Sequence, residues 1–194
     1  MHEFDLYLFS LINATSDTAL WLLDWGRFLT WWPQIFAIVS LSFLLLRKNQ
    51  YGLGWCVKVC ATVLLAIGLN QLMSWVLPFV TPLSLGAGHH WMRGAAQNHW
   101  GGNYPILLFT VSFVCFFWNQ RSYFTGWIFF LALANAWGVI FIGNYFPLQI
   151  LIALGIGLVA SGLVVFIFRG HDYYLHHYKS QIQGRRGKAD ALTL

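Results

Sequence analysis

The dominant pattern in this chain is a series of long, nearly uncharged apolar runs separated by short polar segments. The runs lie within residues 18–46, 53–77, 104–118, 123–142 and 148–168. A helix needs about 20 apolar residues to cross a bilayer. A transmembrane β-barrel would instead show short segments in which apolar and polar residues alternate. The pattern therefore predicts an all-α integral membrane protein, a bundle of about five transmembrane helices.

Two further segments complete the expected organisation. Residues 4–12 are apolar but too short to span a bilayer, so we expect a short N-terminal interfacial helix that ends at a polar turn over 13–17. The first residues are acidic, so no cleavable signal peptide is expected. The polar, basic residues 171–194 predict a cytoplasmic tail that starts as a separate membrane-surface helix and frays. We therefore predict one membrane-embedded domain, 1–170, followed by the tail, 171–194.

Charge is scarce and unevenly placed. Only 9% of the residues are charged and the net charge is +5, whereas about a quarter of a soluble domain is charged. Basic residues gather at run ends and in the tail, which favours anionic headgroups over nucleic acid as their partner. The positive-inside rule places Arg47, Lys48, Arg121 and Arg169 in the cytoplasm. The N-terminal helix, the long loop and residues 139–149 then share the outer face, which is periplasmic if the membrane is a bacterial inner membrane.

Polar residues inside the runs are candidates for a site. Asp24 and Arg27 lie three apart on one helix face, so they form an interfacial ion pair, or Arg27 binds a lipid phosphate. Asn70 and Gln71 lie deep in the second run, where such residues hydrogen-bond to other helices or line a cavity. The fifth run carries small residues at four-residue spacing, which predicts close helix packing: Ala153, Gly157 and Ser161.

The longest loop, residues 78–103, carries a further set of candidates: His89, His90, Arg93 and His99. Loops of this length are usually functional or disordered, and its Trp, His and Gly content favours a loop packed over the helices. The histidines then make interfacial hydrogen bonds, perform lipid-phosphate chemistry, or bind a metal or haem. The last role is disfavoured, because adjacent histidines on a helix point about 100° apart. We expect no metal and no cofactor.

Three segments carry a resemblance to a known family: 69–71 (Leu-Asn-Gln), 85–89 (Leu-Gly-Ala-Gly-His) and 143–149 (Gly-Asn-Tyr-Phe-Pro-Leu-Gln). With the helical pattern, they resemble the type 2 phosphatidic acid phosphatase superfamily, especially its bacterial undecaprenyl-diphosphate phosphatase branch. Active members carry the motifs K-x6-R-P, P-S-[G/D]-H and S-R-x5-H-x3-D. The resemblance implies that Lys and two Arg hold the phosphoryl group, one His, oriented by Asp, attacks it, and the other His protonates the leaving group.

In this chain the spacing of those motifs is kept, but the reactive residues are not. The family has six functional positions, which are in chain order a Lys, an Arg, the acid His, an Arg, the nucleophilic His and an Asp. In this chain they are occupied, in the same order, by Ser74, Thr81, Asn103, Val139, Tyr145 and Gln149. A slip of a few residues in the second motif would bring His99 near the acid position. Without cations, a low-dielectric site has nothing to offset the charge of a diphosphate. The resemblance therefore implies a retained fold without the phosphohistidine mechanism.

Two functional hypotheses follow. In the first, the protein is non-catalytic and binds a membrane lipid (an isoprenoid or a phospholipid) or a membrane-protein partner in a neutral, aromatic outer-face pocket. In the second, it is an active lipid-phosphate or undecaprenyl-diphosphate phosphatase that uses His89, His90 or His99. The candidate ligand-binding residues are Arg27, Asn70, Gln71, His89, His90, Arg93, His99, Asn103, Tyr145 and Gln149.

Overall fold

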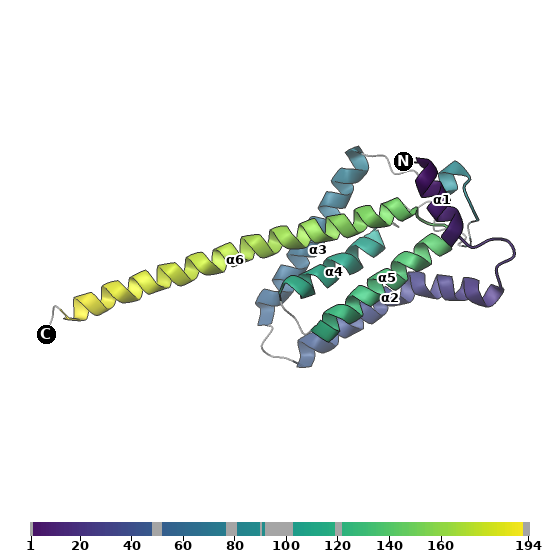
Figure 1. Ribbon diagram of the computed structural model, residues 1–194. Helices are drawn as coiled ribbons and strands as arrows, with labels where there is room; N and C mark the ends of the chain where they lie inside the picture. Colours follow the sequence, from purple (N-terminus) through teal and green to yellow (C-terminus); the bar gives the residue numbers. More distant parts are fainter. Residues whose placement is uncertain are drawn as a thin grey trace.

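The described part of the chain is entirely helical. The computed structural model describes residues 2–47, 52–76, 81–89, 91, 103–118 and 122–191. Within these ranges there are six α-helices, one 3-10 turn and no strand (Figure 1). Their bounds are α1 His2–Ile12, α2 Leu20–Arg47, α3 Gly52–Val76, η1 Leu83–Leu85, α4 Asn103–Phe117, α5 Ser122–Phe141 and α6 Pro147–Ala191. The five predicted apolar runs correspond to α2–α6, and the predicted fold class is confirmed.

Several of these helices are suited to a bilayer. Among the described residues, three stretches are long and apolar enough to cross it: Gly54–Val76 in α3, Tyr123–Phe141 in α5 and Pro147–Gly170 in α6. The apolar part of α4, Pro105–Phe117, is shorter. With 28 residues, α2 is long enough by length alone. The chain is thus an integral membrane protein.

The helices pack around α4, α5 and α6. Helix α4 packs against α5 and α6, α2 packs against α5, and α3 packs against α4 and α6. Helix α1 contacts α5 and α6 and lies across the end of the bundle where α5 ends and α6 begins (Figure 1). The centre of the core consists of side chains with no exposed surface: Phe109, Val114, Cys115, Ile128 and Ala132.

The predicted small-residue stripe on α6 lies at the α4–α6 contact. Ala153, Gly157 and Ser161 are all buried. A Cβ atom added to Gly157 would lie 3.0 Å from the backbone nitrogen of Thr110, and the Ser161 hydroxyl donates a hydrogen bond to the Thr110 carbonyl at 3.2 Å. The prediction of close packing is confirmed, because the backbones approach to a distance that only small residues permit.

One expectation about the C-terminal end is wrong. The apolar stretch ends at Gly170, close to Arg169 as expected, but we expected a separate membrane-surface helix to follow it. Instead α6 runs without a break from Pro147 to Ala191, and Figure 1 shows it projecting well beyond the bundle. Between Pro147 and Ala191 no further proline interrupts the helix. Each glycine in the C-terminal part of α6 destabilises it by only about 1 kcal/mol relative to alanine. The division into domains at residue 170 stays a prediction.

Candidate functional site

The turn after α1, the end of α5 and the loop before α4 meet at the buried side chain of Asn13. The Asn13 Nδ2 group donates to the carbonyls of His89 (3.2 Å) and Phe141 (3.1 Å), and Oδ1 accepts from the His89 N–H at 2.9 Å. One amide thus pairs with both the N–H and the C=O of His89, as the backbone of a neighbouring strand would. We call this meeting point the Asn13 junction; it comprises Asn13, His89, Trp91 and Phe141.

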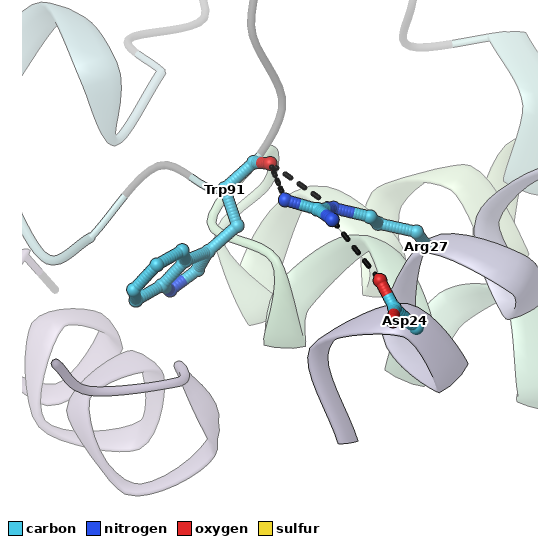
Figure 2. Close-up of polar contacts among 3 residues, drawn as sticks. All are labelled: Asp24, Arg27 and Trp91. Carbon is cyan, nitrogen blue, oxygen red and sulfur yellow. Dashed lines mark hydrogen bonds and ion pairs between the residues drawn. The ribbon is translucent and has the colours of Figure 1, made fainter. Parts of the chain in front are cut away.

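Trp91 fixes the loop at a second point of the junction. Its N–H donates to the Ile142 carbonyl at 3.3 Å, and its indole Nε1 donates to the Ala14 carbonyl at 3.2 Å. Its own carbonyl accepts from Arg27 Nε (3.3 Å) and Nη2 (3.0 Å), and Arg27 Nη1 pairs with Asp24 Oδ1 at 3.1 Å (Figure 2). The predicted ion pair is confirmed, and Arg27 also ties α2 to the loop. Its role as a lipid-phosphate ligand stays a prediction.

Two glycines make the junction possible. Gly88 has φ 70° and Gly143 has φ 83°, a backbone region that side chains disfavour. A Cβ atom at Gly88 would overlap Asn13 Oδ1, and one at Gly143 would overlap the His89 carbonyl oxygen. The loop therefore approaches the end of α5 as closely as it does because neither residue has a side chain.

Helix α5 ends in a Schellman motif around Gly143. The Asn144 N–H donates to the Val139 carbonyl at 2.9 Å, and the Gly143 N–H donates to the Ile140 carbonyl at 3.0 Å. This pairing, with a left-handed glycine between, satisfies the last carbonyls of a helix. It also reverses the chain, so that α6 can begin at Pro147.

Helix α6 begins with a cap shared between two helices. The Phe146 N–H donates to Gln149 Oε1 at 2.9 Å, and the Leu148 N–H donates to Asp5 Oδ1 of α1 at 2.9 Å. In an ordinary capping box the N-cap side chain and the residue three positions later make both bonds. Here Asp5, which is buried, supplies the first partner from another helix, and Pro147 occupies the first helical position that proline favours.

In the structure, the residues at the three third-motif positions contribute to core packing or to the capping of α6. Val139, at the Arg position, is 1% exposed inside the main hydrophobic cluster. Tyr145, at the position of the nucleophilic His, is half-buried and packs against the same cluster. Gln149, at the Asp position, caps α6 through its side-chain oxygen. Their proposed part in ligand binding stays a prediction.

The first-motif positions serve local structure in a similar way. The Ser74 hydroxyl donates to the Gln71 carbonyl at 2.7 Å within the last turns of α3. The Thr81 hydroxyl accepts from the Ser84 N–H at 3.3 Å and starts η1. In the second motif, Asn103 is the first residue of α4, and its side chain lies outside the described part.

The remaining candidates are only partly covered by the structure. Asn70 is half-buried and Gln71 exposed on α3, while the exposed His89 ring stacks on Trp91 at 6.0 Å and 14°. His90, Arg93 and His99 lie outside the described residues. Within the described ranges, no group of three or more His, Cys, Asp or Glu is placed to hold a metal ion. Whether the candidates converge on one pocket stays a prediction.

No protein-family model matches the chain. The sequence is 24% identical over 180 residues, 90% of this chain and 88% of the relative, to a protein of Escherichia coli K12 provisionally named undecaprenyl-diphosphatase YbjG. The structure is similar to that of LpxE from Aquifex aeolicus, with a TM-score of 0.58 and 17% identity over 82% of this chain and 93% of that one.

Both proteins are members of the type 2 phosphatidic acid phosphatase superfamily. The resemblance predicted from the sequence is therefore confirmed, and the chain has the fold of that superfamily.

Proposed function

We propose that this chain is a membrane protein that keeps the fold of a lipid phosphatase without its phosphohistidine chemistry. It binds a membrane lipid, or a membrane-protein partner, at its outer face. One observation carries the proposal: Val139, Tyr145 and Gln149 stand where the resemblance implies Arg, His and Asp, and Val139 is sealed in the core while Gln149 caps α6.

Positive charge is what these positions lack for phosphoryl transfer. Phosphoryl transfer requires cations close to the oxygens on which negative charge develops. Valine at 139 supplies none, and the described positions of the first motif carry the hydroxyls of Ser74 and Thr81. The carbonyl oxygen of Gln149 already accepts a helix-capping bond, so it is a poor substitute for a carboxylate that orients a base. Hydroxyls and amides still suit the polar end of a lipid.

The relative suggests the ligand class. Its name refers to undecaprenyl diphosphate, so an isoprenoid lipid is the first candidate and a phospholipid the second. The cell membrane would be the bacterial inner membrane. The Asn13 junction would face the periplasm and the C-terminus the cytoplasm, because Arg47 ends α2 and Arg169 lies at the far end of the apolar stretch of α6, both remote from the junction.

The test combines lipid analysis with an activity assay. Protein purified in mild detergent is extracted, and its isoprenoid and phospholipid content per chain is measured by mass spectrometry. We expect about one lipid retained per chain, and less in Tyr145→Phe than in the matched control Tyr123→Phe, whose ring is 91% exposed. The proposal fails if neither lipid nor a membrane protein co-purifies with the chain, or if the chain releases phosphate from undecaprenyl diphosphate.

An active phosphatase is the second candidate, and the presentation of His89 favours it. The His89 backbone is held by Asn13 on both sides while its imidazole is exposed and stacked on Trp91. In this account His89, with His90 or His99, acts on a lipid phosphate. A His89→Ala protein that retains all of a measured phosphatase activity would exclude a role for this histidine.

A further inference from the structure

Helix α2 contains a buried proline in its interior. Pro33 has no N–H, so the carbonyl of Leu29, four residues earlier, loses its partner within the helix. Prolines in such positions bend helices, and Figure 1 shows that α2 is bent rather than straight. In a bilayer no water is at hand for the freed carbonyl, so another protein group has to satisfy it.

The missing donor comes from α5. Asn135 has no exposed surface, and its Nδ2 group donates to the carbonyls of Leu29 at 3.1 Å and Thr30 at 2.8 Å. Its Oδ1 atom, by contrast, is buried without a hydrogen-bond partner in the described structure. Burying an unpaired carbonyl oxygen is costly. The Asn135 Nδ2 group is therefore the part of the amide that this site uses, and it donates to the carbonyls that lie next to the Pro33 bend of α2.

The N-terminal half of α2 is fitted closely to α5 at the same place. A Cβ atom added to Gly138 would lie 2.9 Å from Leu29 Cβ and 3.1 Å from the Gly26 carbonyl oxygen. Gly26 in turn faces the ring of Phe141, which belongs to the Asn13 junction. This half of α2 also carries Arg27, which binds the Trp91 carbonyl.

We propose that Asn135 is a positioning residue that locks α2 at its Pro33 bend. Through α2 it sets where Arg27 holds Trp91 at the junction. The lock is a property of the fold and stands apart from any ligand. Its effect on lipid binding rests on the function proposed above.

A double-mutant cycle tests the lock. The parent, Asn135→Leu, Pro33→Ala and the double variant are compared by thermal unfolding in detergent. Asn135→Leu should lower the midpoint by roughly 5 °C when Pro33 is present, because the Leu29 carbonyl is then unsatisfied. In the Pro33→Ala background the new alanine supplies its own N–H to that carbonyl, so the loss should be less than about 2 °C. Equal losses in the two backgrounds would overturn the proposal.

A control and a second readout exclude a general packing effect. Thr125→Val changes another buried polar residue of α5, and its effect on the midpoint, of either sign, should be the same with and without Pro33→Ala. Hydrogen exchange at the Trp91 amide should rise in Asn135→Leu and return to the parent rate in the double variant; an unchanged rate in Asn135→Leu would refute positioning of the loop. If Asn135→Leu does not accumulate, Asn135→Ala replaces it in the same cycle.

The ligand measurement is kept separate. Lipid retained per chain should fall in Asn135→Leu and recover in the double variant. If neither the parent nor any variant retains lipid while the cycle still shows coupling, the lipid-binding form of the proposed function fails and the role of Asn135 is supported. If lipid is retained but the cycle shows no coupling, the lock fails and the function stands.

Discussion

Replacing Asn13 by alanine should loosen the whole junction between α1, α5 and the loop before α4. The change removes three hydrogen bonds from a side chain that is 8% exposed. Each is worth about 1 kcal/mol net. Water can replace part of the loss at the partly buried His89 peptide but little at the buried Phe141 carbonyl. We therefore expect a loss of roughly 2–3 kcal/mol in unfolding free energy, or about 5–10 °C in the midpoint for a chain of this size.

The assay is thermal unfolding in detergent together with hydrogen exchange of peptides that cover residues 81–91. Exchange should rise at His89 and Trp91 and stay unchanged in α4. Asn13→Asp is the matched variant: it keeps the acceptor for the His89 N–H but turns a carboxylate oxygen toward two carbonyls, so it should be at least as destabilising. Ser16→Ala, in the same turn and exposed, should change nothing. An Asn13→Ala protein within 1–2 °C of the parent, roughly 0.5 kcal/mol, would refute the assigned role.

Three further predictions concern neighbouring contacts. Gln149→Leu should lower the free energy of unfolding by about 1 kcal/mol, because the Phe146 N–H loses its hydrogen-bond acceptor. Gln149→Glu keeps an oxygen at that place and should be nearly neutral. The thermal unfolding midpoints of the two variants test this difference. Gly143→Ala should lower the free energy of unfolding by roughly 1–3 kcal/mol. A residue with a side chain is strained at φ 83°, and the His89 carbonyl oxygen occupies the space that the new Cβ atom would take. A Gly143→Ala protein as stable as the parent in the same assay would contradict this. Arg27→Met should raise exchange at Trp91, whereas Asp24→Asn should hardly change it, because the Asp24–Arg27 pair is exposed and the bonds to the Trp91 carbonyl remain. Equal exchange in Arg27→Met and the parent would show that Arg27 does not hold the loop.

The helices were predictable because their signals are local. The apolar runs predicted α2–α6, and the four-residue spacing of Ala153, Gly157 and Ser161 predicted the close α4–α6 contact. Asp24 and Arg27 were recognised as a pair because they lie three positions apart on a helix. The apolar span ends at residue 170 as predicted, but the continuation of the same helix to Ala191 was missed, because a change in polarity was interpreted as a change in backbone structure.

The junction was not predictable because its bonds join residues far apart in the chain. Asn13 reaches His89 and Phe141, which lie 76 and 128 positions away. In the sequence Asn13 is an ordinary turn residue.

The α6 cap was not predictable from the sequence either, because one of its two partners, Asp5, comes from α1. The only local signal was Pro147 followed by Gln149, three positions after Phe146. Asn135 was overlooked because its significance depends on a proline in another helix.

We propose that the protein keeps the fold of a lipid phosphatase and has lost the phosphohistidine chemistry. The most direct test is phosphate release from undecaprenyl diphosphate by the purified chain, measured beside the Escherichia coli relative YbjG in the same detergent. We expect this chain to release no phosphate above the no-enzyme background. An active lipid phosphatase serves as the positive control. Turnover at about 1 s⁻¹ or faster, in the ordinary range for enzymes, would contradict the claim.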